Sequence, residues 1–327
     1  MKRILAVLMV LVMLLTLAGC GAGSKAGELP KNIELQVPAK AGGGTDVMAR
    51  TVATQITKDT GANVNIINNT DGGGVVAMET IRNAKSDGSK LLFFHTTMLI
   101  KTATGVYDKS ATEDFTVIGA AVSSEKGGYV LVVRSDSGIE NLEDLIAEAK
   151  NRPGELLFGV ETGGSAHIMT GMFAKEAGID IKYVEAGSDT DKLTALVGGS
   201  IDAAFVNPNQ ARQYYEAGKI NVLGCFSSDE EGGRSSVLPD VPSFIEQGYD
   251  LQFATIVFVL GPKGMDEALA QKLYDHFAQA AGHDDVNAVL KPAGMDLIFF
   301  SREEGIERLK AQEQLINEMV KELGLDK

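Results

Sequence analysis

The sequence predicts an α/β protein with two doubly wound domains that face each other across a central cleft. The hydrophobic pattern alternates between the period of a strand and that of a helix along most of the chain. Glycine-rich turns follow strands and open helices at three places. The predicted strands are also too many for a single domain of usual size. Such alternation favours parallel sheets covered by helices on both faces, with ligands beyond the carboxyl ends of the strands.

Short apolar runs bounded by glycine, proline or polar residues define the elements. The predicted strands are 33–37, 64–67, 91–94, 117–122, 129–133, 156–160, 181–184, 203–206, 222–226 and 256–260. The predicted helices are 47–58, 75–83, 142–150, 168–176, 192–197 and 210–216, and the chain after residue 260 is predicted to be mostly helical. We expect the chain to cross between the domains near Tyr129 and near Gln252. Domain 1 would then comprise 31–128 and 252–327, domain 2 would comprise 129–251, and the crossings would form a hinge.

The first residues are typical of an export signal. Lys2 and Arg3 precede an apolar core that ends in Leu17-Ala18-Gly19-Cys20, the pattern of a bacterial lipobox. We therefore expect a signal peptide over 1–19, lipidation of Cys20, and a flexible tether over 20–30. The alternative is an uncleaved anchor, but the apolar run is short for a membrane span. The protein is expected outside the cytoplasm, held to the cell membrane as a lipoprotein.

Charge and cysteine content exclude several classes of function. Removing Lys2 and Arg3 from the formal charge of −14 leaves −16, which argues against nucleic acid as a partner. Cys225 lies in an apolar run and is predicted to be a buried strand residue. No spacing of histidines or cysteines indicates zinc, so we expect neither a metal nor a cofactor.

The glycine loops point to a small anion as the ligand. Gly42–Gly44 precede a helix opened by Thr45 or Asp46, and similar loops occur at Gly72–Gly74 and Gly163–Ser165. A helix that begins at such a loop directs free N–H groups and a positive dipole end at a ligand. Phosphate is the competing anion, but the sequence lacks GxxxxGK[ST] and has no GxGxxG after a strand.

The same segments resemble the receptors of the tripartite tricarboxylate transporter family, also called Bug receptors. Their first loop, P-x-x-x-G-G-x-x-D-x-x-A-R, stands here as PAKAGGGTDVMAR, and their second, N-x-x-G-x-G, begins at Asn69. Further similar segments are Ala84 to Gly88, Gly163 to His167, Gly198 to Asp202 and LPDVPSFIEQGY. The family's V-P-Y-K-G stands here as YVEAG, without the proline and the lysine. The resemblance implies a two-lobed fold of the periplasmic-binding-protein type II.

The resemblance also implies that backbone amides and bridging waters of the first loop hold a ligand carboxylate, and that Ser165 and nearby amides hold its other end. Asp46 and Arg50, four residues apart, are predicted to pair with each other rather than with the ligand. Lys40 is either a solvated loop residue or the charge partner of the ligand, and His167 is either a packed residue or a contact. The candidate ligand-binding residues are Lys40, Ala41, Gly42, Gly43, Gly44, Thr45, Asn69, His95, Thr96, Gly163, Gly164, Ser165, His167, Gly187 and Asn207.

The sequence therefore predicts a receptor that binds a small carboxylate between two lobes and delivers it to the membrane permease subunits of a tricarboxylate-type transporter. Di- and tricarboxylates, amino acids and aromatic acids all remain open as ligands. An enzyme that acts on a carboxylate in the same cleft is one alternative, although GxSxG and any nucleophile–base set are absent. A receptor that docks on a sensor protein is another.

Overall fold

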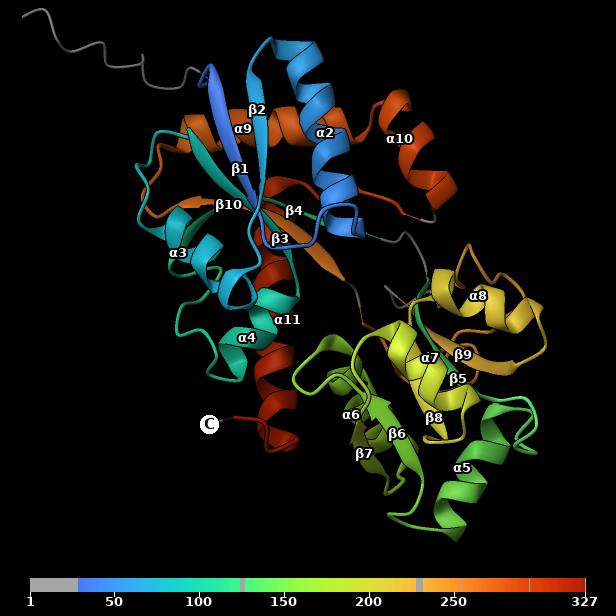
Figure 1. Ribbon diagram of the computed structural model, residues 1–327. Coiled ribbons are helices and arrows are strands. Elements are labelled where there is room, and N and C mark those ends of the chain that lie inside the picture. Colours follow the sequence, from blue (N-terminus) through green and yellow to red (C-terminus); the bar gives the residue numbers. More distant parts are fainter. Residues whose placement is uncertain (1–28, 124–126, 228–231, 254, 294, 327) are drawn as a thin grey trace, which may run out of the picture.

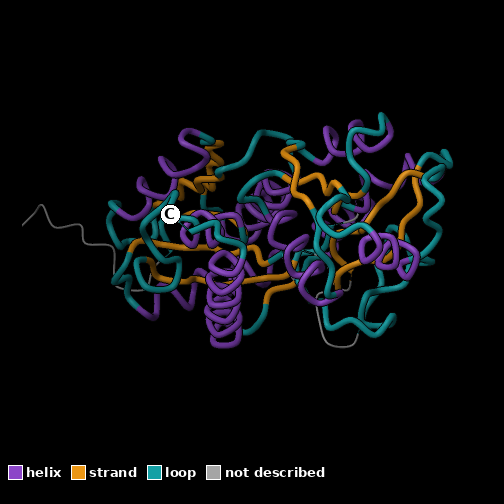
Figure 2. The backbone as a smooth tube through the Cα atoms, turned by 90° about the horizontal axis from the view of Figure 1, so that it is seen from below, coloured by secondary structure: helices purple, strands orange, loops and turns teal. Residues whose placement is uncertain are grey.

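The computed structural model describes residues 29–123, 127–227, 232–253, 255–293 and 295–326. They form two lobes, each built on one sheet (Figures 1 and 2). The six-stranded sheet of lobe 1 has the order β11-β4-β10-β3-β1-β2. The five-stranded sheet of lobe 2 has the order β7-β6-β8-β5-β9. This is the α/β architecture with a cleft between two lobes that the sequence predicts.

The strands of lobe 1 are β1 (Asn32–Val37), β2 (Asn63–Asn68), β3 (Lys90–His95), β4 (Phe115–Val122), β10 (Ile256–Pro262) and β11 (Ile298–Phe299). Its helices are α2 (Gly44–Thr60), α3 (Val75–Arg82), α4 (Thr97–Ala103), α9 (Glu267–Ala281), α10 (Asp284–Leu290) and α11 (Arg302–Glu322), with short 3₁₀ turns η1 (Asp71–Gly74) and η2 (Lys291–Ala293). Neighbouring residues of β3 point to opposite faces. Leu91 and Phe93 pack with α2, α9 and α10, whereas Leu92 and Phe94 pack with α3, α4 and α11.

Lobe 2 repeats this arrangement on a smaller scale. Its strands are β5 (Gly127–Arg134), β6 (Leu157–Val160), β7 (Lys182–Glu185), β8 (Ala203–Val206) and β9 (Ile220–Ser227), and its helices are α5 (Leu142–Asn151), α6 (Ser165–Ala177), α7 (Asp189–Val197) and α8 (Pro208–Glu216). Val130 and Val132 of β5 face α7 and α8, whereas Leu131 and Val133 face the cluster that contains α5 and α6. Both faces of each sheet are therefore buried.

The predicted parallel pairing holds for part of each sheet, and both sheets also contain antiparallel strands. β10 runs antiparallel to β3 and β4, and β5 runs antiparallel to β8 and β9. The cause is the double crossing between the lobes, because each of these strands starts at the cleft and runs away from it. Strands such as β1 and β6 run the other way and bring their carboxyl ends to the cleft. Two short elements, α4 and β11, were also not predicted.

The lobes are joined by two chain segments that lie side by side. The backbone N–H of Ser123 donates to Thr255 O (3.3 Å), and that of Phe253 donates to Ser227 O (2.9 Å). A third connection is the last turn of α11, where Glu322 forms an ion pair with Lys175 of α6 (2.8 Å). The side chain of Leu323 packs over Gly171 of the same helix. The chain passes from the sheet of lobe 1 to that of lobe 2 between β4 and β5, and returns between β9 and β10. The predicted domain boundaries at 128/129 and 251/252 stay a prediction.

Candidate functional site

A cavity of about 330 Å³ lies between the lobes, at the carboxyl ends of the parallel strands. Lobe 1 contributes the start of α2 and the end of β3, and lobe 2 contributes the starts of α7 and α8. The crossing segments form its floor. The lining residues are Gly44, Thr45, Met48, His95, Ser123, Gly128, Tyr129, Asp189, Asn207, Pro208, Asn209, Gln210, Ser235, Ser236, Val237, Phe253, Thr255, Val257 and Met295. We call this cavity the cleft.

The first glycine loop aims the start of α2 at the cleft. Gly42 has a φ of 80°, a left-handed conformation that favours glycine, and Gly43 is extended at φ −73° and ψ 163°. The N–H of Gly43 donates to Lys40 O (3.0 Å), and its carbonyl accepts from Val47 N (2.9 Å). The N–H groups of Gly44 and Thr45 have no acceptor within the described residues. They are free to bind an anion in the cleft.

Asp46 fixes this loop from behind. Its side chain is buried and accepts hydrogen bonds from Gly42 N (2.9 Å), Arg50 Nη2 (2.7 Å) and Asn68 Nδ2 (2.9 Å). Burial alone would raise the pKa of Asp46, but the bonds from Arg50, Gly42 and Asn68 outweigh it and lower that pKa. The predicted pair of Asp46 with Arg50 is confirmed. The carboxylate is thus occupied within the protein.

The third glycine loop, in lobe 2, has the same backbone. Gly163 is left-handed at φ 72°, Gly164 is extended at φ −93° and ψ 173°, and the N–H of Gly164 donates to Glu161 O (2.8 Å). The N–H of Gly163 donates to His167 Nδ1 (3.3 Å), which stands where Asp46 stands in the first loop. Burial lowers the pKa of His167, and the charge of Glu185 opposes that shift.

The carboxylate of Glu185 in lobe 2 already accepts a backbone N–H group of this third loop. Glu185 accepts the N–H groups of Thr162 (2.8 Å) and Gly187 (3.0 Å). Hydrogen bonds from Thr162 are the main cause of the lowered pKa of Glu185. The loop therefore has less capacity for an external anion than the first loop has.

The second glycine loop packs against the first. Gly72, Gly73 and Gly74 have φ values of 58°, 66° and 94°, and a Cβ on Gly74 would stand 2.6 Å from Pro38 Cβ. Only glycine fits there without a shift of the first loop. Asn69 stabilises the turn, because its side chain accepts the N–H of Asp71 (3.1 Å).

The lobe 2 wall of the cleft carries an ion pair that sequence reasoning missed. Asp189 Oδ1 lies 2.6 Å from Lys192 Nζ, and Asp189 Oδ2 accepts the N–H of Asn207 (3.0 Å). The Lys192 side chain is 2% exposed and also donates to Phe205 O (2.8 Å). Ser188 and Asp191 form a capping box that starts α7 at Asp189. The Ser-x-x-Asp pattern could have placed the helix start there, three residues before the predicted one.

His95 is the last residue of β3 and Thr96 follows it, but only His95 lines the cleft. Burial lowers the pKa of His95 to about 4, so the imidazole is neutral near pH 7. Thr96 is fully buried, and its hydroxyl donates to Ile256 O (3.3 Å) and accepts from Ile256 N (3.0 Å). Thr96 thus binds the start of β10, where the chain re-enters lobe 1, to the end of β3.

Comparison with known proteins agrees with this geometry. The sequence model described as "Tripartite tricarboxylate transporter family receptor" matches residues 48–325. The chain belongs to this family. It is therefore a solute-binding receptor, of a kind that acts outside the cytoplasm.

Relatives and solved structures cover most of the receptor. Protein BugT of Bordetella pertussis is 29% identical over 286 residues, which is 86% of this chain and 85% of that protein. A TctC solute-binding protein from Polaromonas superposes with a TM-score of 0.76 at 23% identity, over 89% of this chain and 98% of that one. A Rhodopseudomonas palustris structure with bound malate has a TM-score of 0.67 at 21% identity, over 88% and 98%. These solved structures show the two-domain fold of periplasmic binding proteins.

The predicted site residues of the receptor separate into groups. Four of them line the cleft, namely Gly44, Thr45, His95 and Asn207. Asn207 also caps α8 through its side chain, which accepts the N–H of Asn209 (2.9 Å). The others do not line the cleft in this structure: Lys40, Ala41, Gly42, Gly43, Asn69, Thr96, Gly163, Gly164, Ser165, His167 and Gly187.

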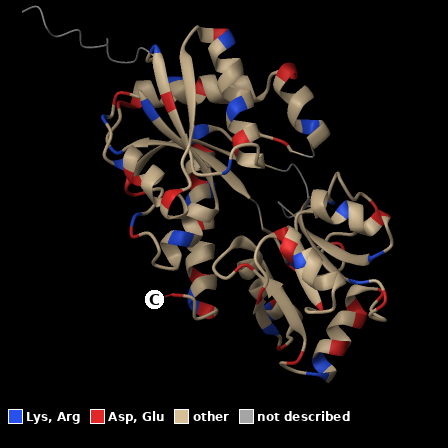
Figure 3. Ribbon diagram, viewed as in Figure 1, with Lys and Arg blue, Asp and Glu red and all other residues tan. Residues whose placement is uncertain are grey.

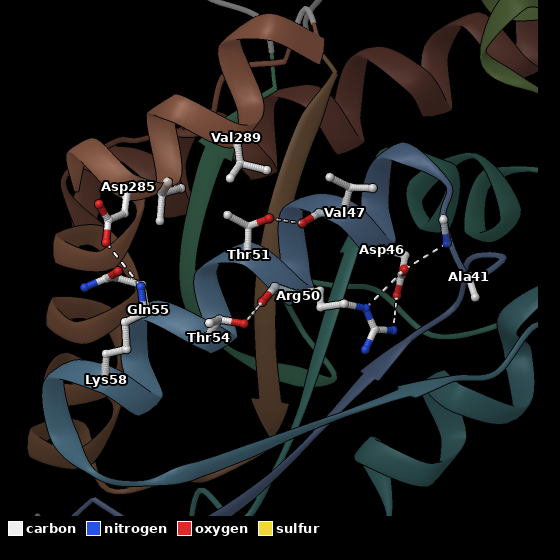
Figure 4. A pocket seen from close by; sticks show the side chains of 12 residues that line it. Ala41, Asp46, Val47, Arg50, Thr51, Thr54, Gln55, Lys58, Asp285 and Val289 are labelled. Carbon is white, nitrogen blue, oxygen red and sulfur yellow. Dashed lines mark hydrogen bonds and ion pairs between the residues drawn. The ribbon is translucent and has the colours of Figure 1, made fainter.

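Ala41 and Gly42 instead line a second cavity of about 600 Å³ between α2 and α10 (Figure 4). Val47 and Thr51 of α2 face Val289 of α10 across it. At one end Asp285 forms an ion pair with Lys58 (3.1 Å), and at the other end stands the Asp46–Arg50 pair. The α2 helix thus lies between two cavities: Gly44 and Thr45 of its first turn line the cleft, and Asp46 and Val47 line the second cavity.

The described part of the receptor contains no group of metal-ligating side chains, and none of its helices has the length and apolarity needed to span a bilayer. Cys225 is buried in β9, as predicted, and burial is the main cause of the rise in its thiol pKa to about 11. Cys20 and the predicted signal peptide lie outside the described residues.

Proposed function

We propose that this receptor binds a small carboxylate in the cleft, closes its lobes around it, and delivers it to the membrane subunits of a tricarboxylate-type transporter. The observation that carries the proposal is the start of α2. Its free Gly44 and Thr45 amides lie at the cleft surface, and the acid of its first turn, Asp46, is turned away and paired. A seventeen-residue helix presents its positive dipole end at that point.

In a protein with a net negative charge, backbone N–H groups can bind a carboxylate without a basic side chain. Lysine and arginine are absent from the cleft lining within the described chain, so attraction by a side-chain cation does not contribute. Free helix N–H groups bind carboxylates directly or through water, and a bridging water costs little affinity. Two Rhodopseudomonas palustris proteins solved with adipate and with malate have the same fold. Both are small carboxylates, the ligand class proposed for this cleft.

The direct test is to identify the ligand. Purified receptor would be mildly denatured, and the released small molecules identified by mass spectrometry. Thermal melts with di-, tri-, amino and aromatic carboxylates would follow. A ligand that binds only the folded protein at 100 times its Kd adds about 2.7 kcal/mol to stability, which raises the melting midpoint visibly. A flat response to every class would contradict the proposal, and conversion of a ligand would favour the enzyme.

Lipid anchoring at Cys20 is a separate part of the proposal. It is supported by the lipobox that ends at Cys20 behind a basic and apolar leader. In cell fractionation the wild type should sediment with membranes, and Cys20→Ala should shift the protein to the soluble fraction. Ser24→Ala, just beyond the lipobox, serves as the control and should leave the distribution unchanged. A Cys20→Ala variant that still sediments would show that the anchor lies elsewhere.

Delivery to a permease can be separated from docking on a sensor protein. Uptake of the identified ligand by cells should be lost on deletion of the receptor and restored by the wild type. Unchanged uptake together with a lost transcriptional response to the ligand would favour the sensor.

A further inference from the structure

The charges of the cleft differ between its two walls. On the lobe 1 side stand the free amides of α2 and a neutral His95. On the lobe 2 side stands Asp189, the one acidic residue of the lining in the described chain. Its charge and that of Glu161 also raise the pKa of Tyr129, after the larger effect of burial, so both carboxylates lie near that hydroxyl. The lobe 1 wall presents free amides to a ligand, and the lobe 2 wall presents a carboxylate.

Asp189 cannot turn away from the cleft. Its Oδ1 is held by Lys192 Nζ and its Oδ2 by the N–H of Asn207, and the carboxyl side chain stays 12% exposed. Lys192 stands behind it, 2% exposed, so the ligand meets the carboxylate and not the ammonium group. Asp189 is also the first residue of α7, where its negative charge occupies the position that the helix dipole offers to an anion.

We propose that Asp189 makes this receptor select ligands that carry one carboxylate and, at the other end, a protonated amine. The inference rests on the proposed function, because it assumes that α2 holds the carboxylate. The far end of a bound ligand then faces Asp189. A second carboxylate there would meet a like charge in a partly desolvated wall, which is strongly unfavourable, whereas an ammonium group would donate to the free lone pairs of Asp189.

Matched pairs of ligands test the selection. Succinate and β-alanine, glutarate and 4-aminobutyrate, and adipate and 5-aminovalerate each have the same number of methylene groups and differ only in the terminal group. Titration calorimetry on the full-length receptor would give the affinities. We expect the amino member of the best-fitting pair to bind at least about tenfold more tightly than its dicarboxylate.

A charge-neutral double variant tests the role of Asp189. Asp189→Asn alone would leave Lys192 buried without a counter-ion, so Asp189→Asn is combined with Lys192→Gln, which can still donate to Phe205 O. In the double variant the preference for the amine over the dicarboxylate should fall to threefold or less. Binding of the ligand's carboxylate at α2 should stay about as strong as in the wild type. The control removes an exposed pair of the same lobe, Glu148→Gln with Arg152→Gln, and should keep the full preference.

The outcomes separate this inference from the proposed function. If the dicarboxylate binds as tightly as the amine or more tightly, or if only tricarboxylates or aromatic acids bind, Asp189 does not select an amine and the inference is wrong, while the carboxylate receptor stands. If the double variant keeps the tenfold preference, the selection has another source and the inference is again wrong. If no carboxylate of any kind binds, both fail together.

Discussion

The first and third glycine loops have one backbone and different surroundings. Each has a left-handed glycine, then an extended glycine whose N–H returns to the carbonyl three residues earlier, then a helix. In each, the left-handed glycine donates to a side chain four residues ahead, a carboxylate at Asp46 and an imidazole at His167. The same turn therefore does not imply the same ligand chemistry. The groups around the turn decide what it can bind.

In lobe 1 the protein neutralises its own acid and leaves the amides open. Asp46 is enclosed by Arg50, Asn68 and Gly42, so a ligand approaching Gly44 meets free N–H groups and no unpaired carboxylate of this loop. In lobe 2 Glu185 takes the amide of Thr162, and Asp189 stands at the start of α7. Acidic and basic residues are dispersed over both lobes (Figure 3), so overall charge does not explain the contrast. It arises within a few residues of each helix start.

The largest expected effect comes from breaking the ion pair of lobe 2. Lys192→Met should lower the free energy of unfolding by about 3–5 kcal/mol, because it leaves Asp189 and Phe205 O without their buried partner. The matched change in lobe 1 is Arg50→Met. It should cost about 1 kcal/mol or less, since Arg50 is 52% exposed and Asp46 keeps its bonds from Gly42 and Asn68. Urea unfolding of both variants measures the difference.

A second variant shows whether the loss comes from the unpaired acid. Adding Asp189→Asn to Lys192→Met should recover part of the stability, because the uncompensated charge is removed. Equal losses for Lys192→Met and Arg50→Met would mean that the lobe 2 pair is no more important than a surface pair.

Local signals in the sequence accounted for much of this comparison. The glycine loops, the alternating elements and the Asp46–Arg50 pair depend on residues close together in the chain. What was missed depends on distant residues. Thr96 is buried because Ile256, far along the chain, lies beside it. The reversed directions of β5 and β10 follow from the crossings, which strand patterns do not encode.

On the lobe 2 wall of the cleft Asn207 was predicted, but Asp189 was missed for the same kind of reason. Asp189 and Asp191 alone give no acid–base or ligand pattern. Asp189 becomes a cleft residue because Lys192 and Asn207, from α7 and the start of α8, hold it in place. The short helix α4 was not predicted because its apolar run, Met98 to Ile100, is only three residues long and shows no helical period.

An intermediate effect is expected from adding a side chain to the two turns. A Cβ on Gly43 would stand 3.1 Å from Lys40 O, and one on Gly164 would stand 3.1 Å from Glu161 O and 3.3 Å from Glu161 Cβ. Both variants should cost stability, Gly164→Val at least as much as Gly43→Val. Carboxylate affinity should fall about ten- to a hundredfold for Gly43→Val, and less than about threefold for Gly164→Val, in titration calorimetry.

Lys40→Ala is the control for charge in the first loop. Lys40 is exposed and does not line the cleft, so its loss should leave the affinity nearly unchanged. If Lys40→Ala abolishes binding and Gly43→Val does not, the carboxylate is held by a cation and the backbone account of lobe 1 is wrong.

The smallest effect concerns pH and compares the two histidines near the helix starts. Burial lowers the pKa of His95 to about 4 and also lowers that of His167, where Glu185 opposes the shift. A histidine with a depressed pKa binds fewer protons in the folded than in the unfolded state, so stability falls as the pH drops below about 6.5. Between pH 7 and pH 5, His95 should account for a loss of about 1–2 kcal/mol in the free energy of unfolding.

The variant His95→Asn, whose side chain can still accept the N–H of Thr97, should remove that part of the dependence of stability on pH. His167→Asn should remove a smaller part. Urea unfolding at both pH values, without ligand, measures each slope. If His95→Asn leaves the pH dependence of stability unchanged, folding does not lower the pKa of His95. The assignment of a neutral histidine to the cleft wall of lobe 1 would then be wrong.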